Sequence, residues 1–147
     1  MVAGNEIAAA ARRWIGTPYI HQASRRGAGT DCLGLIRGVW RELYGQEPED
    51  VPAYSMDWSE PQGEERLWDA ARRHMSEKPL AALDQGDVVL FRMRTGSVAK
   101  HLGIIGESRE NQSFIHAYSN YGVVESALSH PWRRRIAACF EFPAEAF

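Results

Sequence analysis

Apolar residues at helical spacing dominate the first third of the chain. The alanine-rich run that follows Asn5 predicts a helix over residues 5–14, with Asn5 as its N-cap. Between Thr30 and Gly45, leucine, isoleucine, valine and tryptophan recur with the period of an amphipathic helix. We expect this second helix to begin at Thr30 or Asp31, which are both suitable N-caps, and to end at Gly45.

The connections and the second half of the chain follow other patterns. Residues 16–30, with three glycines and one proline, predict a long loop, and residues 46–63, with three prolines, predict a surface excursion. A third amphipathic helix is predicted over residues 64–75. After Pro79 come short β-rich runs separated by turn residues, at 86–93, 100–106, 113–118, 122–126 and 135–142. Helices followed by an antiparallel meander are typical of an α+β fold, here a single domain over residues 1–147.

Composition narrows the range of partners. The chain has 147 residues, a formal net charge of −2 and a pI near 6.2, which gives no basic surface for nucleic acid or an anionic membrane. No apolar run approaches the roughly 20 residues that cross a bilayer, so no membrane insertion is expected. The first residues are typical of a helix rather than a signal peptide. We therefore expect a protein made in the cytoplasm without a signal peptide.

Cys32 is the first candidate for chemistry. It follows a glycine-rich loop and falls in the first turn of the second helix, where unpaired N–H groups and the helix dipole stabilise a thiolate and lower the thiol pKa. Taken alone, Cys32 could also be a core residue, the commoner role of a lone cysteine, a disulfide partner of Cys139, or a zinc ligand with His101 and His116. Cys139 lies in a buried-strand pattern and is interpreted as core packing.

Two of the five histidines lie inside predicted strands, where they could serve a cysteine nucleophile. His101 shares a strand face with Ile105, and His116 shares one with Phe114. A polar turn separates the two runs, so neighbouring antiparallel strands could place both rings on one surface. One imidazole could then act on the cysteine while the second orients the first. By contrast, His74 is expected to be solvated at a helix end, and His130 to lie in a loop.

The ordered set of motifs resembles the NlpC/P60 superfamily of papain-like cysteine peptidases. The segments are GTPY, DCLGL opening a helix, GDVVLF, HLGIIG and IHA, and the resemblance covers residues 5–142. It implies a papain-like α+β fold in which the nucleophile helix packs on a small antiparallel sheet. It also implies hydrolysis of an amide bond in peptidoglycan stem peptides, often between D-glutamate and a diamino acid, with no metal or other cofactor.

The resemblance also assigns roles to single residues. By position, Cys32 is the nucleophile, His101 the general base and later the acid, and His116 the residue that orients His101. Tyr19 of GTPY matches a tyrosine beside the nucleophile and would hydrogen-bond near the oxyanion. Asp31 matches the acidic residue before the cysteine, which either caps the helix or faces a substrate amine.

One position departs from the family pattern. Many members have serine directly after the nucleophile, where it can help to bind a free amino terminus, and this chain has Leu33. A leucine side chain cannot hydrogen-bond there. We therefore expect attached stem peptides, rather than free recycled peptides, as substrates.

The short chain, with neither a wall-binding repeat domain nor a signal peptide, resembles the phage-tail branch of the family, including the cell-wall peptidases of gene transfer agents. This narrower resemblance implies a component of a phage-like tail tip or baseplate that acts in the periplasm or cell wall. Two alternatives remain open. One is an N-acetylmuramoyl-L-alanine amidase with the same nucleophile, and the other is a tail component without catalysis.

Overall fold

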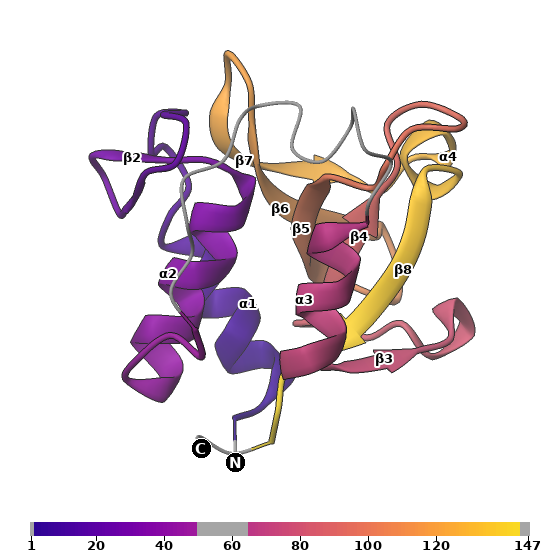
Figure 1. Ribbon diagram of the computed structural model, residues 1–147, viewed down its shortest axis with the longest axis horizontal. Coiled ribbons are helices and arrows are strands. Elements are labelled where there is room, and N and C mark those ends of the chain that lie inside the picture. Colours follow the sequence, from indigo (N-terminus) through magenta and orange to yellow (C-terminus); the bar gives the residue numbers. More distant parts are fainter. Residues whose placement is uncertain (1, 50–64, 145–147) are drawn as a thin grey trace.

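The computed structural model describes residues 2–49 and 65–144 of the protein. The described helices are α1 (Gly4–Arg12), α2 (Cys32–Tyr44), α3 (Arg66–His74), the 3-10 helix η1 (Leu80–Ala82) and α4 (His130–Arg133). The described strands are β1 (Ser24–Arg25), β2 (Gly29–Thr30), β3 (Ser76–Lys78), β4 (Val88–Phe91), β5 (His101–Glu107), β6 (Ser113–Tyr118), β7 (Gly122–Ala127) and β8 (Ile136–Glu141). Most of the predicted excursion over residues 46–63 lies outside the described residues. The mixture of helices with an antiparallel sheet confirms the α+β prediction (Figure 1).

The main sheet has six strands in the order β3-β8-β4-β5-β6-β7, and every paired neighbour is antiparallel. Strands β4 to β7 form the predicted meander. The last strand departs from it, because β8 returns to the opposite side of the meander and pairs with β4 and β3. A simple meander is therefore wrong for β8. β8 lies inside the sheet between β3 and β4, and its Cys139 and Phe140 are buried.

Helices α1 and α2 cover one face of this sheet over β5 and β6. Ile7, Leu35 and Val39 of the helices are buried with Leu102 and Ile104 of β5 in the larger core. The alternation of β5 thus places its leucine and isoleucine toward the helices, as the sequence pattern predicts.

A close contact fixes α1 against α2. The Trp14 ring, 1% exposed, lies so near Gly38 that a Cβ there would come within 2.1 Å of it. The indole Nε1 donates to the Glu42 carboxylate at 3.1 Å.

The first helix differs from its prediction at both ends. It ends at Arg12, so Trp14 follows the helix instead of closing it. The predicted start is also wrong: the N-cap is Ala3, whose N–H donates to the Glu6 carboxylate at 3.3 Å.

The second helix agrees with its prediction at both ends. Asp31 is the N-cap, and Gly45 has a φ of 91°, a left-handed conformation that suits glycine at a helix C-terminus. The preceding loop is more ordered than expected, because it contains the antiparallel β1–β2 hairpin and a parallel bridge between Tyr19 and Thr30. Within residues 2–49 and 65–144, none of the helices has both the length and the apolar character to cross a membrane.

The other face of the sheet carries a smaller core. Val89, Phe91, Ile105 and Phe114 are buried there, and Trp132 of α4 packs against them. The sequence pattern predicted a loop around His130, but one turn of helix, α4, forms there, and its Trp132 packs against this smaller core.

Candidate active site

The start of α2 is fixed by the Asp31 carboxylate. One carboxylate oxygen accepts a hydrogen bond from the Gly34 N–H at 2.7 Å, and the other accepts from the Gln22 N–H at 2.7 Å. Asp31 is 2% exposed, and His21 lies 3.8 Å from it. This is the capping role among the two considered from sequence. Contact of Asp31 with a substrate amine stays a prediction.

Asp31 places Cys32 in the first turn of α2, beside the beginning of β5. The Cys32 Sγ lies 3.6 Å from the carbonyl oxygen of Lys100, the residue directly before His101. The backbone N–H groups of Leu102, Leu33 and Cys32 lie near enough to the sulfur to favour its thiolate. The structure thus brings the thiol to the point where the histidine-bearing strand begins.

The pKa of the Cys32 thiol is shifted upward, whereas its place at a helix N-terminus predicted a downward shift. Burial, and then the negative charge of Asp31, raise the pKa of Cys32 to about 12. The N–H groups of Leu102, Leu33 and Cys32 act in the opposite direction but do not outweigh burial. The resting residue is therefore a neutral thiol, because loss of solvent around sulfur costs more than the helix terminus returns.

His101 and His116 form a direct hydrogen bond. Strands β5 and β6 are neighbours, and the His101 Nε2 lies 2.8 Å from the His116 Nδ1. The second nitrogen of His116, Nε2, lies 2.8 Å from the Ser126 Oγ on β7. This is the shared surface that alternation along the two strands predicts.

Aromatic rings surround this histidine pair. The His116 ring lies between the rings of Phe114 and Tyr118. Its centroid is 4.2 Å from that of Phe114 and 5.3 Å from that of Tyr118. The Trp132 ring of α4 packs against both imidazoles, with its centroid 5.7 Å from that of His101 and 5.3 Å from that of His116. Trp132 was missed at the sequence level, because only the folding of α4 brings it to the pair.

The surroundings keep both imidazoles neutral. Burial, and then the neighbouring His116, lower the pKa of His101 to about 3. Burial lowers the pKa of His116, which is fully buried, to about 4. A neutral imidazole has one nitrogen free to accept a proton, which is the state that a general base requires.

Tyr19 lies on the loop before α2 and packs against the larger core with Cys32. Burial, the charge of a Cys32 thiolate and the charge of Asp31 raise the pKa of Tyr19 to about 12. Its hydroxyl therefore keeps its proton and can donate a hydrogen bond near the sulfur.

The remaining sequence candidates lie elsewhere. Both cysteines are free, and Cys139 is buried in the smaller core as predicted, so the disulfide alternative is wrong. Among residues 2–49 and 65–144, no group of three or more histidine, cysteine or acidic side chains is arranged to hold a metal ion. His74 is not simply solvated: its Nε2 lies 2.8 Å from the Glu49 carboxylate, and its side chain is 25% exposed.

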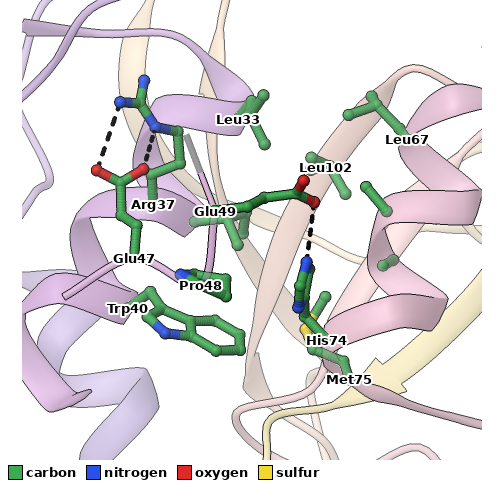
Figure 2. A pocket seen from close by; sticks show the side chains of 13 residues that line it. Leu33, Arg37, Trp40, Glu47, Pro48, Glu49, Leu67, His74, Met75 and Leu102 are labelled. Atoms are coloured by element: carbon green, nitrogen blue, oxygen red, sulfur yellow. Dashed lines mark hydrogen bonds and ion pairs between the residues drawn. The ribbon is translucent and has the colours of Figure 1, made fainter. Parts of the chain in front are cut away.

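A separate apolar pocket of about 100 Å³ lies between α2 and α3 (Figure 2). Leu33, Leu67 and Leu102 line it, and an ion pair between Arg37 and Glu47 and a hydrogen bond between His74 and Glu49 lie around it. Leu33 and Leu102 directly follow Cys32 and His101 in the chain. The residue that departs from the family pattern is therefore part of an apolar wall, which explains why leucine suits this position.

The depressed pKa of His116 makes stability depend on pH. An unfolded histidine binds a proton near pH 6.5 and the folded His116 only near pH 4, so stability is lost as the pH falls between these values. At pH 5 this one group should cost about 2 kcal/mol relative to pH 7. Urea unfolding of the wild type and of His116→Asn at both pH values measures it. The variant should lose about 2 kcal/mol less than the wild type, and an equal loss would contradict the neutral buried state.

Several known proteins are similar to this chain in sequence. Residues 16–140 match the sequence model of the NlpC/P60 family. The murein DD-endopeptidase MepS/murein LD-carboxypeptidase of Escherichia coli K12 is 32% identical over 124 residues, which cover 83% of this chain and 54% of that protein. The probable endopeptidase NlpC of the same strain is 26% identical over 125 residues, or 84% of this chain and 68% of that protein. The chain thus spans about half the length of the first relative.

Solved structures show the same fold. The NlpC/p60 domain of the peptidoglycan hydrolase SagA aligns over 96% of this chain and all of that one, with a TM-score of 0.65 and 21% identity. NlpC1 from Trichomonas vaginalis aligns over 95% of this chain and 44% of that one, with a TM-score of 0.65 and 19% identity. At about 20% identity, the likeness to these structures shows a shared fold only. Membership of a family is shown by the match to the family's sequence model. The chain belongs to the NlpC/P60 family.

Proposed function

We propose that the protein is a cysteine peptidase that hydrolyses an amide bond in peptidoglycan stem peptides. The observation that carries this proposal is the meeting of Cys32, at the start of α2, with the strand that bears the hydrogen-bonded pair His101 and His116. The names of the related proteins, a murein endopeptidase and a peptidoglycan hydrolase, support cell-wall peptide as the substrate. A nucleophile, a base and an orienting group are the parts that acyl transfer requires.

The proton arrangement determines the order of the first step. The neutral thiol and neutral imidazole favour proton transfer from Cys32 to His101 during attack on the carbonyl, rather than a standing ion pair. Because the His101 Nε2 is bonded to His116, the other ring nitrogen, Nδ1, is the one that would take this proton. His116 then supports the imidazolium that forms by accepting from its Nε2–H.

The later steps use the same groups. The sulfur bonds to the carbonyl carbon, and the oxygen that gains the charge is stabilised by the Cys32 N–H and the protonated Tyr19 hydroxyl. Imidazolium His101 protonates the leaving amine as the carbon–nitrogen bond breaks, which leaves a thioester on Cys32. Neutral His101 then activates water, and the thiol is regenerated when the acid product leaves.

Narrower proposals rest on the sequence resemblance. We propose that the bond cut joins D-glutamate to a diamino acid, and that attached stem peptides are preferred, because Leu33 offers no hydrogen bond to a free amino terminus. We also propose that the protein is made in the cytoplasm, is carried on a phage-like tail tip or baseplate, and acts on the wall.

Removal of the nucleophile tests the proposed function. Cys32→Ala should reduce release of peptide fragments from purified sacculi by more than 1,000-fold, the order of loss seen when a catalytic nucleophile is removed. Cys139→Ala is the matched control, because it removes the other free cysteine from the opposite face of the sheet and should retain activity. Chelator treatment of the wild type should leave the rate unchanged. Full activity of Cys32→Ala would refute the nucleophile.

The two histidines should differ in their tolerance of substitution. His101→Ala removes the base and should lose more activity than His116→Asn, because an asparagine can still hydrogen-bond to the His101 ring. The expected ratio between the two losses is about tenfold or more, the value of one hydrogen bond to a developing charge. Initial rates on sacculi measure it. If the order were reversed, the roles of the two residues would be exchanged.

The products distinguish the peptidase from an amidase. Mass spectrometry of digested sacculi should find stem peptides cut internally, with their amino-terminal residues still attached to the glycan. A muramoyl-alanine amidase would release intact stem peptides and leave bare glycan strands. Because both enzymes would use Cys32, the Cys32→Ala digest serves as the blank for both products.

A further inference from the structure

We propose that Ser126 is a positioning residue, which holds the protons of His116 and His101 in the arrangement that leaves the His101 Nδ1 free to take the thiol proton. This inference rests on the proposed function and deepens it. None of the sequence motifs includes Ser126, which lies two strands away from His101 on β7.

The placement of Ser126 follows from the strand register. Phe114 pairs with Ser126 and His116 pairs with Val124, so the serine shares a sheet face with the histidine and lies diagonally from it. Its Oγ is 2.8 Å from the His116 Nε2, and the His116 Nδ1 is 2.8 Å from the His101 Nε2. The three side chains thus form one continuous line of hydrogen bonds across β5, β6 and β7.

Only two arrangements of protons fit this line. In the first, His101 donates its Nε2–H to the His116 Nδ1, and His116 donates its Nε2–H to the Ser126 Oγ, which leaves the His101 Nδ1 without a proton. In the second, Ser126 donates to His116, His116 donates to His101, and the remaining proton of neutral His101 lies on Nδ1. Only the first arrangement provides a base for the thiol.

Burial makes the serine oxygen important in the first arrangement. His116 is fully buried, with aromatic rings around it, so its Nε2–H has no access to bulk water. A buried N–H without a hydrogen-bond acceptor is strongly unfavourable. Ser126 is only partly buried, so it can accept from His116 while its own proton faces water. Its hydroxyl thereby links the buried His116 to solvent.

The same arrangement is needed when His101 carries both protons. Imidazolium His101 must donate from Nε2, so the His116 Nδ1 must accept, and His116 must again donate to Ser126. The serine thus supports the resting base and the charged intermediate with one set of bonds.

Nitrogen spectra of the imidazoles test this proposal without a substrate. In uniformly ¹⁵N-labelled full-length wild type at pH 7, long-range ¹H–¹⁵N correlation should show both rings protonated at Nε2. Ser126→Ala should give His116, and with it His101, a mixed population with substantial Nδ1–H. Ser126→Thr keeps a hydroxyl and should restore the wild-type spectrum. Ser113→Ala is the matched control, because this serine on β6 bonds Glu125 rather than a histidine, and it should leave both spectra unchanged.

Rates on sacculi give the second measurement. Ser126→Ala should lower kcat about tenfold with little change in KM, and Ser126→Thr should restore most of kcat. A wild-type His101 protonated at Nδ1, or tautomers that do not change in Ser126→Ala, would overturn the proposal. The spectra need no turnover, so inactivity of the wild type on sacculi would refute the proposed function and leave the proton arrangement to be judged by itself.

Discussion

The buried carboxylate of Asp31 is the interaction on which the site depends. Its two oxygens bind the N–H of Gly34 inside α2 and that of Gln22 in the preceding loop. One side chain therefore begins the helix and fixes the loop that carries Tyr19. Cys32 is the first residue of the helix that Asp31 caps, so the cap also sets where Cys32 lies beside β5.

The same carboxylate creates an electrostatic conflict at the sulfur. Its negative charge lies beside the thiol and opposes ionisation, while three backbone N–H groups favour it. Burial outweighs the N–H groups and favours the neutral thiol. Burial also lowers the pKa of His101 and of His116, which favours neutral imidazoles. Without substrate, the Cys32 thiol and the His101 imidazole are both uncharged rather than a thiolate–imidazolium pair. Charge develops only when a substrate carbonyl is present, which suits a nucleophile that must survive without being oxidised or blocked.

The residues that the sequence predicts are those whose positions depend on local pattern. Alternation along β5 and β6 is sufficient to place His101 and His116 on one face, and the Asp31 cap follows from residue type at a helix start. The sign of the Cys32 pKa shift was wrong, because burial depends on chain segments far apart in sequence. Ser126 and Trp132 could not be found, because their contacts depend on the register of β7 and on a single helical turn in α4.

The two ends of the described chain meet, since the Val2 N–H donates to the Ala144 carbonyl at 3.0 Å (Figure 1). They lie at the opposite end of the molecule from the junction between β2 and α2, where Cys32 begins α2. Because Val2 and Ala144 lie side by side, a connection to another polypeptide at either of them would leave from the same place on the domain. A host protein that carried it as an insertion, or a circular permutant joined at that point, would present the catalytic end outward with its contacts intact.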